Sequence, residues 1–336
     1  MPTMKDVAQA AGVSVTTVSH VINETRYVSE DLRARVLQAM EELNYHPNIL
    51  ARSLRQGITH TIGLIVPDNS NPFFAEIARV AETVGFENDY SVILCNSDKN
   101  VERESAYINV LIAKQVDGVI FIAAGSEQQH LRELAAQGIP VVVADREVPQ
   151  ELADVVLVNH EQGGYDATRH LITSGHRRIA CIAGPSPLTP SADRVRGYRR
   201  ALREAGIPIE EELMVRCTES YLGGETAMAQ LLRLDELPTA VFTYNDVTAI
   251  GALRAIRNAG LQVPEDLSIV GFDDIPLASA VVPALTTVAQ PIADLATLAT
   301  ELLIARIQNS EEYEPGQRIV LDTKLVVRES CALPRS

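Results

Sequence analysis

Residues 3–23 read TMKDVAQAAGVSVTTVSHVIN, and this stretch decides the architecture at the start of the chain. Apolar residues recur at helical spacing up to Ala11, and Gly12 then breaks the pattern. Ser14 is a good N-cap for a second helix, whose apolar side contains a row of valines. The spacing therefore predicts two short helices joined by a turn of three residues.

A third helix is predicted from the same two signals, an N-cap residue and an apolar stripe. Ser29 is its expected N-cap, and an apolar stripe runs from Leu32 to Leu43. His46-Pro47 stops it. Three short helices within 1–46 match an all-α helix-turn-helix domain. Residues 47–59 contain a short helix-capable stretch, too short to be stable alone, which we interpret as a hinge helix and linker.

The pattern changes at residue 60 to strand-like runs alternating with amphipathic helical segments. Runs of Val and Ile separated by helices predict doubly wound parallel sheets, and the number of runs exceeds one sheet of ordinary size. We expect two Rossmann-like lobes with a ligand between them, facing the carboxyl ends of the strands. The runs are 62–67, 91–96, 118–123, 141–145, 155–159, 179–183, 215–218, 240–244, 268–272, 286–290 and 319–327.

The uneven distribution of charge and the absence of several motifs narrow the classes of function that the chain can have. The net charge of −15 falls wholly on the residues after position 60, because the first 60 hold six basic and six acidic side chains. The N-terminal segment is thus electrostatically distinct from the acidic remainder. No signal peptide, phosphate-binding glycine loop, nucleophile elbow or metal-ligand spacing stands in the sequence. We therefore expect a cytoplasmic protein that is not an enzyme and has no cofactor or metal.

The amino-acid sequence of the chain resembles those of the LacI/GalR family of transcriptional repressors. Residues 3–55 carry the resemblance most specifically, in TMKDVAQAAGVSVTTVSHVIN and ELNYHPNILARSLR, and are closest to the purine and ribose-operon members. Later motifs continue it, including IGLIVPDNSNPFF, VDGVIF, TAVFTYND, IVGFDD and PALTTVAQP. The resemblance implies a periplasmic-binding-protein-like body at 60–336 that binds an effector and dimerises. Its N-terminal lobe would hold about 60–160 plus 291–320, and its C-terminal lobe about 161–290 plus 321–336.

The second helix carries short hydrogen-bonding side chains on one side, as a helix that reads base edges requires. The resemblance places Thr16, Thr17 and His20 against bases, with Val15 where the closest relatives often carry Thr. Phosphate contacts would come from Thr3, Ser14, Asn23, Arg26 and Tyr27. Leu54 would wedge into the minor groove beside Ala51, Arg52 and Arg55, and so kink the DNA. The implied partner is a palindromic operator bound by a homodimer, because two-fold protein symmetry needs two half-sites.

The effector site is implied at strand ends and helix starts of the body. Carboxylates, amides and Arg hydrogen-bond vicinal hydroxyls, and aromatic rings offer an apolar face, which is the chemistry of a sugar site. The implied residues are Asn71, Phe73, Phe74, Asp145, Arg146, Arg194, Tyr221, Asn245, Asp273 and Gln290. A sugar is favoured as effector, and a purine stays open because the closest members include a purine binder.

Two other functions compete with a ligand-responsive repressor. A solute-binding protein for transport would share the two-lobed body, but the added helical domain and the absence of a signal peptide oppose it. A sugar-acting enzyme would need an acid/base pair about 5–9 Å apart around the scissile bond, and the sequence shows none. In the repressor, effector binding changes operator affinity through the marginal hinge, by a coupling of about 1–3 kcal/mol.

Overall fold

The structure is a computed structural model that describes residues 2–45, 58–122, 128–185, 190–309 and 316–335. The chain divides into two compact units, Met1–Thr59 and His60–Ser336. Among the helices of these described ranges, none is long and apolar enough to cross a membrane. The predicted α/β class with an N-terminal helical domain is confirmed.

The first unit contains the three predicted helices, α1 (Met4–Ala11), α2 (Val15–Asn23) and α3 (Glu30–Glu42). Gly12 adopts a left-handed φ of 63° and ends α1, which is the conformation that favours glycine there. A small core holds the helices together, with Val7, Val18 and Val36 fully buried, one from each helix. Ser29 stands at the N-cap of α3, but its side chain makes no capping hydrogen bond.

The second unit contains two six-stranded sheets. The first has the order β11-β5-β4-β3-β1-β2, and with its helices forms the N-terminal lobe. The second has the order β12-β10-β9-β8-β6-β7 and belongs to the C-terminal lobe. The strands of the first sheet are β1 (Thr61–Val66), β2 (Ser91–Asn96), β3 (Gly118–Phe121), β4 (Val141–Ala144), β5 (Asp154–Val158) and β11 (Arg318–Leu321). Those of the second are β6 (Ile179–Ala183), β7 (Met214–Arg216), β8 (Ala240–Thr243), β9 (Ser268–Asp273), β10 (Thr286–Ala289) and β12 (Lys324–Val326).

Each sheet is covered by helices on both faces, which explains the continuous apolar strands. One core of the N-terminal lobe joins the sheet to α5 (Pro72–Glu87) and α13 (Ile292–Gln308), and the other joins it to α6 (Val101–Ala113) and α7 (Gln128–Ala136). In the C-terminal lobe, α8 (His160–Thr173) and α9 (Ser191–Glu204) cover one face. The other carries α10 (Tyr221–Leu231) and α11 (Asp246–Asn258), beside η1 (Glu211–Leu213) and α12 (Pro276–Ala280).

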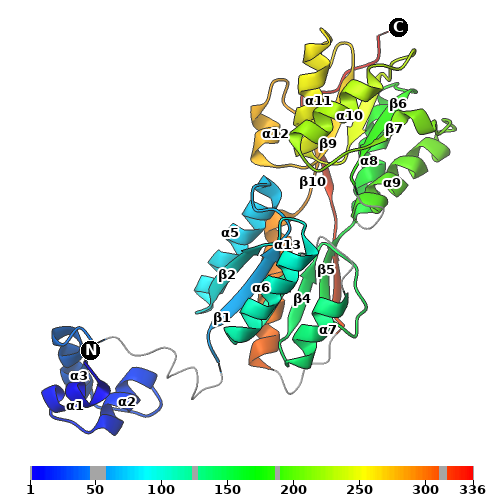
Figure 1. The fold of residues 1–336 in the computed structure, drawn as a ribbon. Helices are drawn as coiled ribbons and strands as arrows, with labels where there is room; N and C mark the ends of the chain where they lie inside the picture. The colour runs from blue at the N-terminus through cyan, green and yellow to red at the C-terminus, as the bar shows by residue number, and fades with distance from the viewer. Residues whose placement is uncertain (1, 46–57, 123–127, 186–189, 310–315, 336) are drawn as a thin grey trace. The chain divides into compact units, whose positions relative to one another are not determined.

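The predicted single strand 319–327 is wrong. Its residues form two strands in different sheets: β11 pairs in parallel with β5, and β12 pairs antiparallel with β10. The chain therefore crosses between the lobes three times, from β5 to α8, from β10 to α13 and from β11 to β12. Figure 1 shows the last crossing as the red segment that runs from one sheet to the other. Parallel order alone was expected, so the antiparallel β12 is a second correction.

Candidate functional site

Helix α2 presents a polar, exposed start and a buried apolar side. Ser14 caps it, accepting from the Thr17 amide at 3.0 Å, and the Ser14 and Thr17 hydroxyls lie 2.8 Å apart. Thr16 is exposed, while Val18 is buried in the core of the domain. Val15 keeps 40% of its surface exposed, although its apolar character predicted the inner side. The first turn of α2 thus offers Val15 and Thr16 to a partner.

Several residues predicted to contact DNA already have partners within the domain. Thr3 forms a capping box with Asp6, its hydroxyl lying 2.7 Å from Asp6 Oδ2. Asn23 donates to the Ser19 carbonyl at 2.8 Å. His20 Nδ1 lies 2.8 Å from the Thr25 hydroxyl, which leaves Nε2 as the outer edge of the ring. Each of these contacts is compatible with a structural role alone.

Arg26 and Tyr27 follow α2 and are exposed, Tyr27 by 89%. This exposure leaves both side chains accessible to a partner. The predicted minor-groove residues Ala51, Arg52, Leu54 and Arg55 lie outside the described residues.

The body holds a cavity of about 360 Å³ between its two sheets. Its walls follow the carboxyl ends of β1, β3 and β4 in one sheet and of β6, β8 and β9 in the other, where ligands of open α/β sheets bind. The starts of α5 and α9 complete it. Of the predicted effector residues, the structure gathers around it Asn71, Phe73, Phe74, Asp145, Arg146, Arg194, Asn245 and Asp273.

Two predicted residues do not line this cavity. Tyr221 starts α10 and lies instead in a separate groove between α10 and α11. Gln290 stands behind the wall, where its Nε2 donates to Asp273 Oδ1 at 2.7 Å. The amides of Asn71 and Asn245 are the N-caps of α5 and α11 and accept from backbone amides at 3.0 Å. Asn71 and Asn245 therefore fix helix starts as well as facing the cavity.

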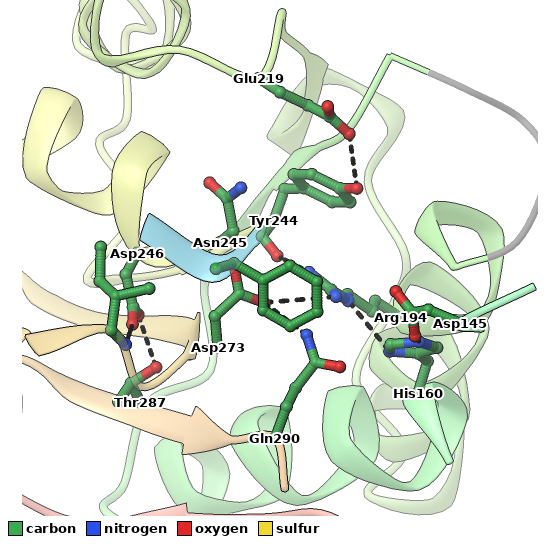
Figure 2. Close-up of polar contacts among 12 residues, drawn as sticks. Asp145, His160, Arg194, Glu219, Tyr244, Asn245, Asp246, Asp273, Thr287 and Gln290 are labelled. Atoms are coloured by element: carbon green, nitrogen blue, oxygen red, sulfur yellow. Dashed lines mark hydrogen bonds and ion pairs between the residues drawn. The ribbon is translucent and has the colours of Figure 1, made fainter. Parts of the chain in front are cut away.

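Arg194 is the centre of a buried polar network shown in Figure 2. Its guanidinium donates to the Tyr244 carbonyl at 2.6 Å, lies 3.4 Å from Asp273 Oδ1 and donates from Nε to His160 Nδ1 at 3.4 Å. The same group lies 3.8 Å from the centre of the Phe272 ring, a cation–π contact. Because the guanidinium is buried and contacts all of these groups at once, it is held in one orientation.

Asp273 and Asp145 occupy strained backbone positions, with φ of 110° and 62°. Non-glycine residues in this region are costly and collect at functional sites. Burial raises the pKa of Asp273 to about 7, against the opposing effects of Arg194 and Gln290. A carboxyl with this pKa exchanges its proton near neutral pH, and it can accept from or donate to a ligand hydroxyl.

His160 joins Asp145 to Arg194 and was missed by the sequence reasoning. Its Nε2 lies 2.6 Å from Asp145 Oδ1 (Figure 2). Because Arg194 donates to Nδ1, the ring proton sits on Nε2 and the imidazole is neutral. Burial lowers the pKa of His160, in agreement with this tautomer. The contact with Asp145 is therefore a hydrogen bond between a neutral ring and a carboxylate.

The cavity also contains polar residues that the sequence reasoning did not name. They are Lys99, Ser191, Glu219 and Tyr244. Tyr244 directly precedes Asn245 at the end of β8, so its place at a strand end was a usable signal. Lys99 and Glu219 stand in loops with no comparable signal.

Two family models together match nearly the whole chain. Residues 3–48 match "Bacterial regulatory proteins, lacI family", and residues 59–324 match "Periplasmic binding proteins and sugar binding domain of LacI family". The chain belongs to the LacI family. It is accordingly a DNA-binding transcriptional regulator and not an enzyme. The resemblance read from the sequence is confirmed.

Curated relatives and solved structures agree with this membership. The ribose operon repressor of Escherichia coli K12 is 43% identical over 333 residues, covering 98% of this chain and 100% of the relative. The repressor PurR of Photorhabdus laumondii is 42% identical over 332 residues, covering 98% and 97%. The lac repressor dimer bound to operator and the anti-inducer ONPF matches with a TM-score of 0.87 at 29% identity, over 98% of this chain and 99% of that one. A LacI-family regulator from Enterococcus faecium with bound ribose matches with a TM-score of 0.75 at 34% identity, over 82% and 100%.

Proposed function

We propose that this LacI-family regulator is a cytoplasmic repressor that binds a palindromic operator as a homodimer, with an affinity set by a small sugar in the cavity of the body. Residues 1–46 would bind DNA, 47–59 would form the hinge, and 60–336 would bind effector and dimerise. The observation that carries the effector proposal is the meeting of Asp145, Arg194 and Asp273 at one cavity, from both lobes of the body.

The cavity fits a neutral polyol. Its volume of about 360 Å³ falls in the range of about 300–1,000 Å³ that small-molecule sites occupy. Phe73 and Phe74 make an edge-to-face pair with ring centres 5.0 Å apart, and offer the apolar surface on which a sugar ring can lie. The carboxylates and Arg194 supply hydrogen bonds to hydroxyl groups. The ribose bound by the Enterococcus faecium relative makes D-ribose the first probe.

The DNA contact is proposed at the start of α2. Val15 and Thr16 are exposed there, so their methyl groups and the Thr16 hydroxyl can reach base edges in a major groove. Thr17, the outer edge of His20, and exposed Arg26 and Tyr27 lie in or just after the same helix. The lac repressor that matches this chain is bound to operator in its structure, which supports the same use of this domain here.

The dimer contact is proposed at the groove between α10 and α11. Exposed apolar side chains surround it, with Leu222 70% and Val282 93% exposed. A patch of this kind is unfavourable in water unless a partner covers it. A second copy is the occupant that we propose, because the matching lac repressor is a dimer. Leu222→Glu should shift the protein from dimer to monomer in sedimentation, while Leu333→Glu, equally exposed but outside the groove, should leave it dimeric.

The effector proposal is tested by thermal unfolding of the full chain with D-ribose, cellobiose and hypoxanthine. A ligand that binds only the folded state raises the melting temperature. We expect a rise with D-ribose that Asp145→Ala abolishes. Glu147→Ala is the matched control, because this neighbouring carboxylate is exposed and does not line the cavity. A rise with hypoxanthine alone would favour a purine effector, and no rise with any of the three contradicts the proposal for these ligands.

The DNA proposal is tested by selecting binding sites from random duplexes with the full chain. We expect a palindrome, bound at physiological salt more tightly than random DNA and with an affinity that the effector changes. Thr16→Ala should lower the preference for the selected site, by about 1–3 kcal/mol per lost base contact. Gln38→Ala, at an exposed position of α3, should leave this preference unchanged. Recovery of no preferred sequence would contradict a sequence-specific operator.

A further inference from the structure

An ion pair joins the two lobes directly at the cavity. Lys99 Nζ lies 2.5 Å from Glu219 Oε2, and both residues line the cavity. Lys99 follows β2 in the N-terminal lobe, whereas Glu219 lies between β7 and α10 in the C-terminal lobe. The contact is therefore a non-covalent link between the lobes, in addition to the three chain crossings and the hydrogen bond of Asp145 with His160.

The Glu219 carboxylate is also held in place by a contact other than the ion pair with Lys99. The Tyr244 hydroxyl donates to its other carboxylate oxygen, Oε1, at 2.6 Å (Figure 2). Tyr244 is itself buried, and Glu219 is mostly shielded from water. A side chain fixed in this way loses less entropy when it forms an ion pair, so the pair is stronger than one between two mobile surface groups.

Lys99 sits in a turn that is unfavourable on local grounds. Asp98 and Lys99 both have a φ of 55°, in the left-handed region. The following residue, Asn100, is the N-cap of α6, and the helix dipole disfavours a positive charge at this end. Local conflicts of this kind persist where another interaction offsets them, and they mark functional positions. Here the ion pair with Glu219 offsets the unfavourable backbone conformation of Lys99 and its unfavourable charge at the start of α6.

The pair also removes a free charge from the cavity. Three cationic side chains line the cavity, those of Lys99, Arg146 and Arg194. Lys99 is neutralised by Glu219, Arg194 lies 3.4 Å from Asp273, and Arg146 is held in the field of the neighbouring Asp145 carboxylate. A phosphate or carboxylate ligand would have to take a cation from its partner and leave a carboxylate uncompensated in a partly buried site. An uncharged ligand leaves both pairs intact.

We propose that Lys99 and Glu219 form an interlobe latch that holds the cavity closed and selects uncharged effectors over phosphorylated ones. This rests on the proposed function in that the cavity takes the effector. Lys99 and Glu219 lie on different lobes and outside the crossing segments. A rotation of one lobe against the other about these segments therefore changes the distance between Lys99 Nζ and Glu219 Oε2. Breaking the latch opens the cavity, and freeing Lys99 gives an anion a partner.

The first experiment needs no ligand. Ser191 lines the cavity, is buried, and its hydroxyl has no hydrogen-bond partner among the described residues, so Ser191→Cys places a probe thiol inside. Its reaction rate with iodoacetamide, followed by peptide mass spectrometry in the full chain, reports opening. Burial raises the pKa of the four native thiols to about 11 or 12, which suppresses their background reaction.

In this background, Lys99→Glu and Glu219→Lys should each raise the rate about tenfold, because an attraction becomes a repulsion. The double exchange Lys99→Glu with Glu219→Lys should restore a rate close to that of the parent. Arg103→Glu is the matched control, since Arg103 pairs with Asp98 at 3.0 Å beside Lys99 but within one lobe. Single exchanges that leave the rate unchanged, or a double exchange that does not restore it, would overturn the latch.

The second experiment tests selectivity by titration calorimetry with D-ribose and ribose 5-phosphate. Glu219→Gln keeps an acceptor for Tyr244 but leaves Lys99 without its carboxylate, so the ratio of the two affinities should move about tenfold or more towards the phosphate. An unchanged ratio contradicts the selectivity. Failure of every sugar to bind, with the thiol rates as expected, would contradict the sugar effector and leave the latch standing.

Discussion

His160 and Asp145 are joined by a hydrogen bond of 2.6 Å although they belong to different lobes. Asp145 follows β4 of the first sheet, and His160 is the first residue of α8, which packs on the second. The bond thus spans the first crossing between lobes and places a carboxylate on the cavity wall. Arg194, on the other side of the same ring, couples it to Asp273.

This arrangement predicts a pH-dependent stability. The unfolded chain protonates this imidazole below about pH 6.5, whereas burial lowers the pKa of His160 in the folded chain. Its contribution to the free energy of unfolding is therefore full above about pH 6.5 and is lost as the pH falls towards the lowered pKa. Between pH 7 and 5, the free energy of unfolding of the wild type should fall more than that of His160→Gln in urea titrations. Parallel pH profiles of the two proteins would contradict the assignment.

Arg194→Lys is expected to lower both stability and ribose binding. Lysine keeps the charge but cannot serve Tyr244, Asp273 and His160 together, because it lacks the planar fork. We expect a loss of about 1–3 kcal/mol in urea unfolding and at least tenfold in ribose affinity. Arg103→Lys is the control, since Arg103 is exposed, pairs with Asp98 at 3.0 Å and lines neither the cavity nor the groove between α10 and α11. Equal effects of both changes would argue against a special place for Arg194.

Gly164→Ala tests how closely α8 must approach α9. A Cβ on Gly164 would lie 2.3 Å from the Arg194 carbonyl oxygen, so the helices would have to separate. The expected cost is about 1–3 kcal/mol, with weaker ribose binding because Arg194 moves. Gly138→Ala meets no atom within 4 Å and should cost only its left-handed backbone strain, with unchanged binding. Melting temperature and calorimetry measure the two effects separately.

Two N-cap serines give a matched pair in the DNA-binding domain. Ser14 accepts from the Thr17 amide, whereas Ser29 makes no capping bond. Ser14→Ala should destabilise its helix by about 1 kcal/mol, and Ser29→Ala should cost less. Hydrogen exchange of the α2 and α3 amides in the full chain measures both. A larger effect of Ser29→Ala would show that the geometry of the first cap carries little energy.

Local signals predicted the site where the chain itself sets the geometry. The family resemblance implied Asp145 and Asp273, and their positions agree with a local signal, because each stands where a buried strand ends and parallel strands end at one edge of a sheet. The helices on either side of Gly12 and Ser14 were predicted from local signals as well, because the residues that end or cap a helix can be recognised in the sequence. Tyr221 also starts a helix, but α10 begins on the face towards α11, which no local pattern reports.

Tertiary contacts explain what the sequence did not predict. His160 reads as an ordinary first residue of a helix, and its role depends on Asp145 and Arg194 reaching it from elsewhere in the fold. The run 319–327 is rich in β-branched and aliphatic residues on both sides of Asp322, and the polar residues near its middle do not reveal that its two halves join different sheets. Lys99 and Glu219 are 120 positions apart and meet only when both lobes have formed.

The division of β11 from β12 also limits how the gene can be shortened. A stop codon after Leu321 would leave the first sheet complete and remove β12 from the second, so β10 would become an open edge with unpaired backbone groups. Bare edges of this kind recruit strands from other molecules. Termination at this point, which removes residues 322–336, should therefore give aggregated protein and not merely a regulator with a trimmed tail.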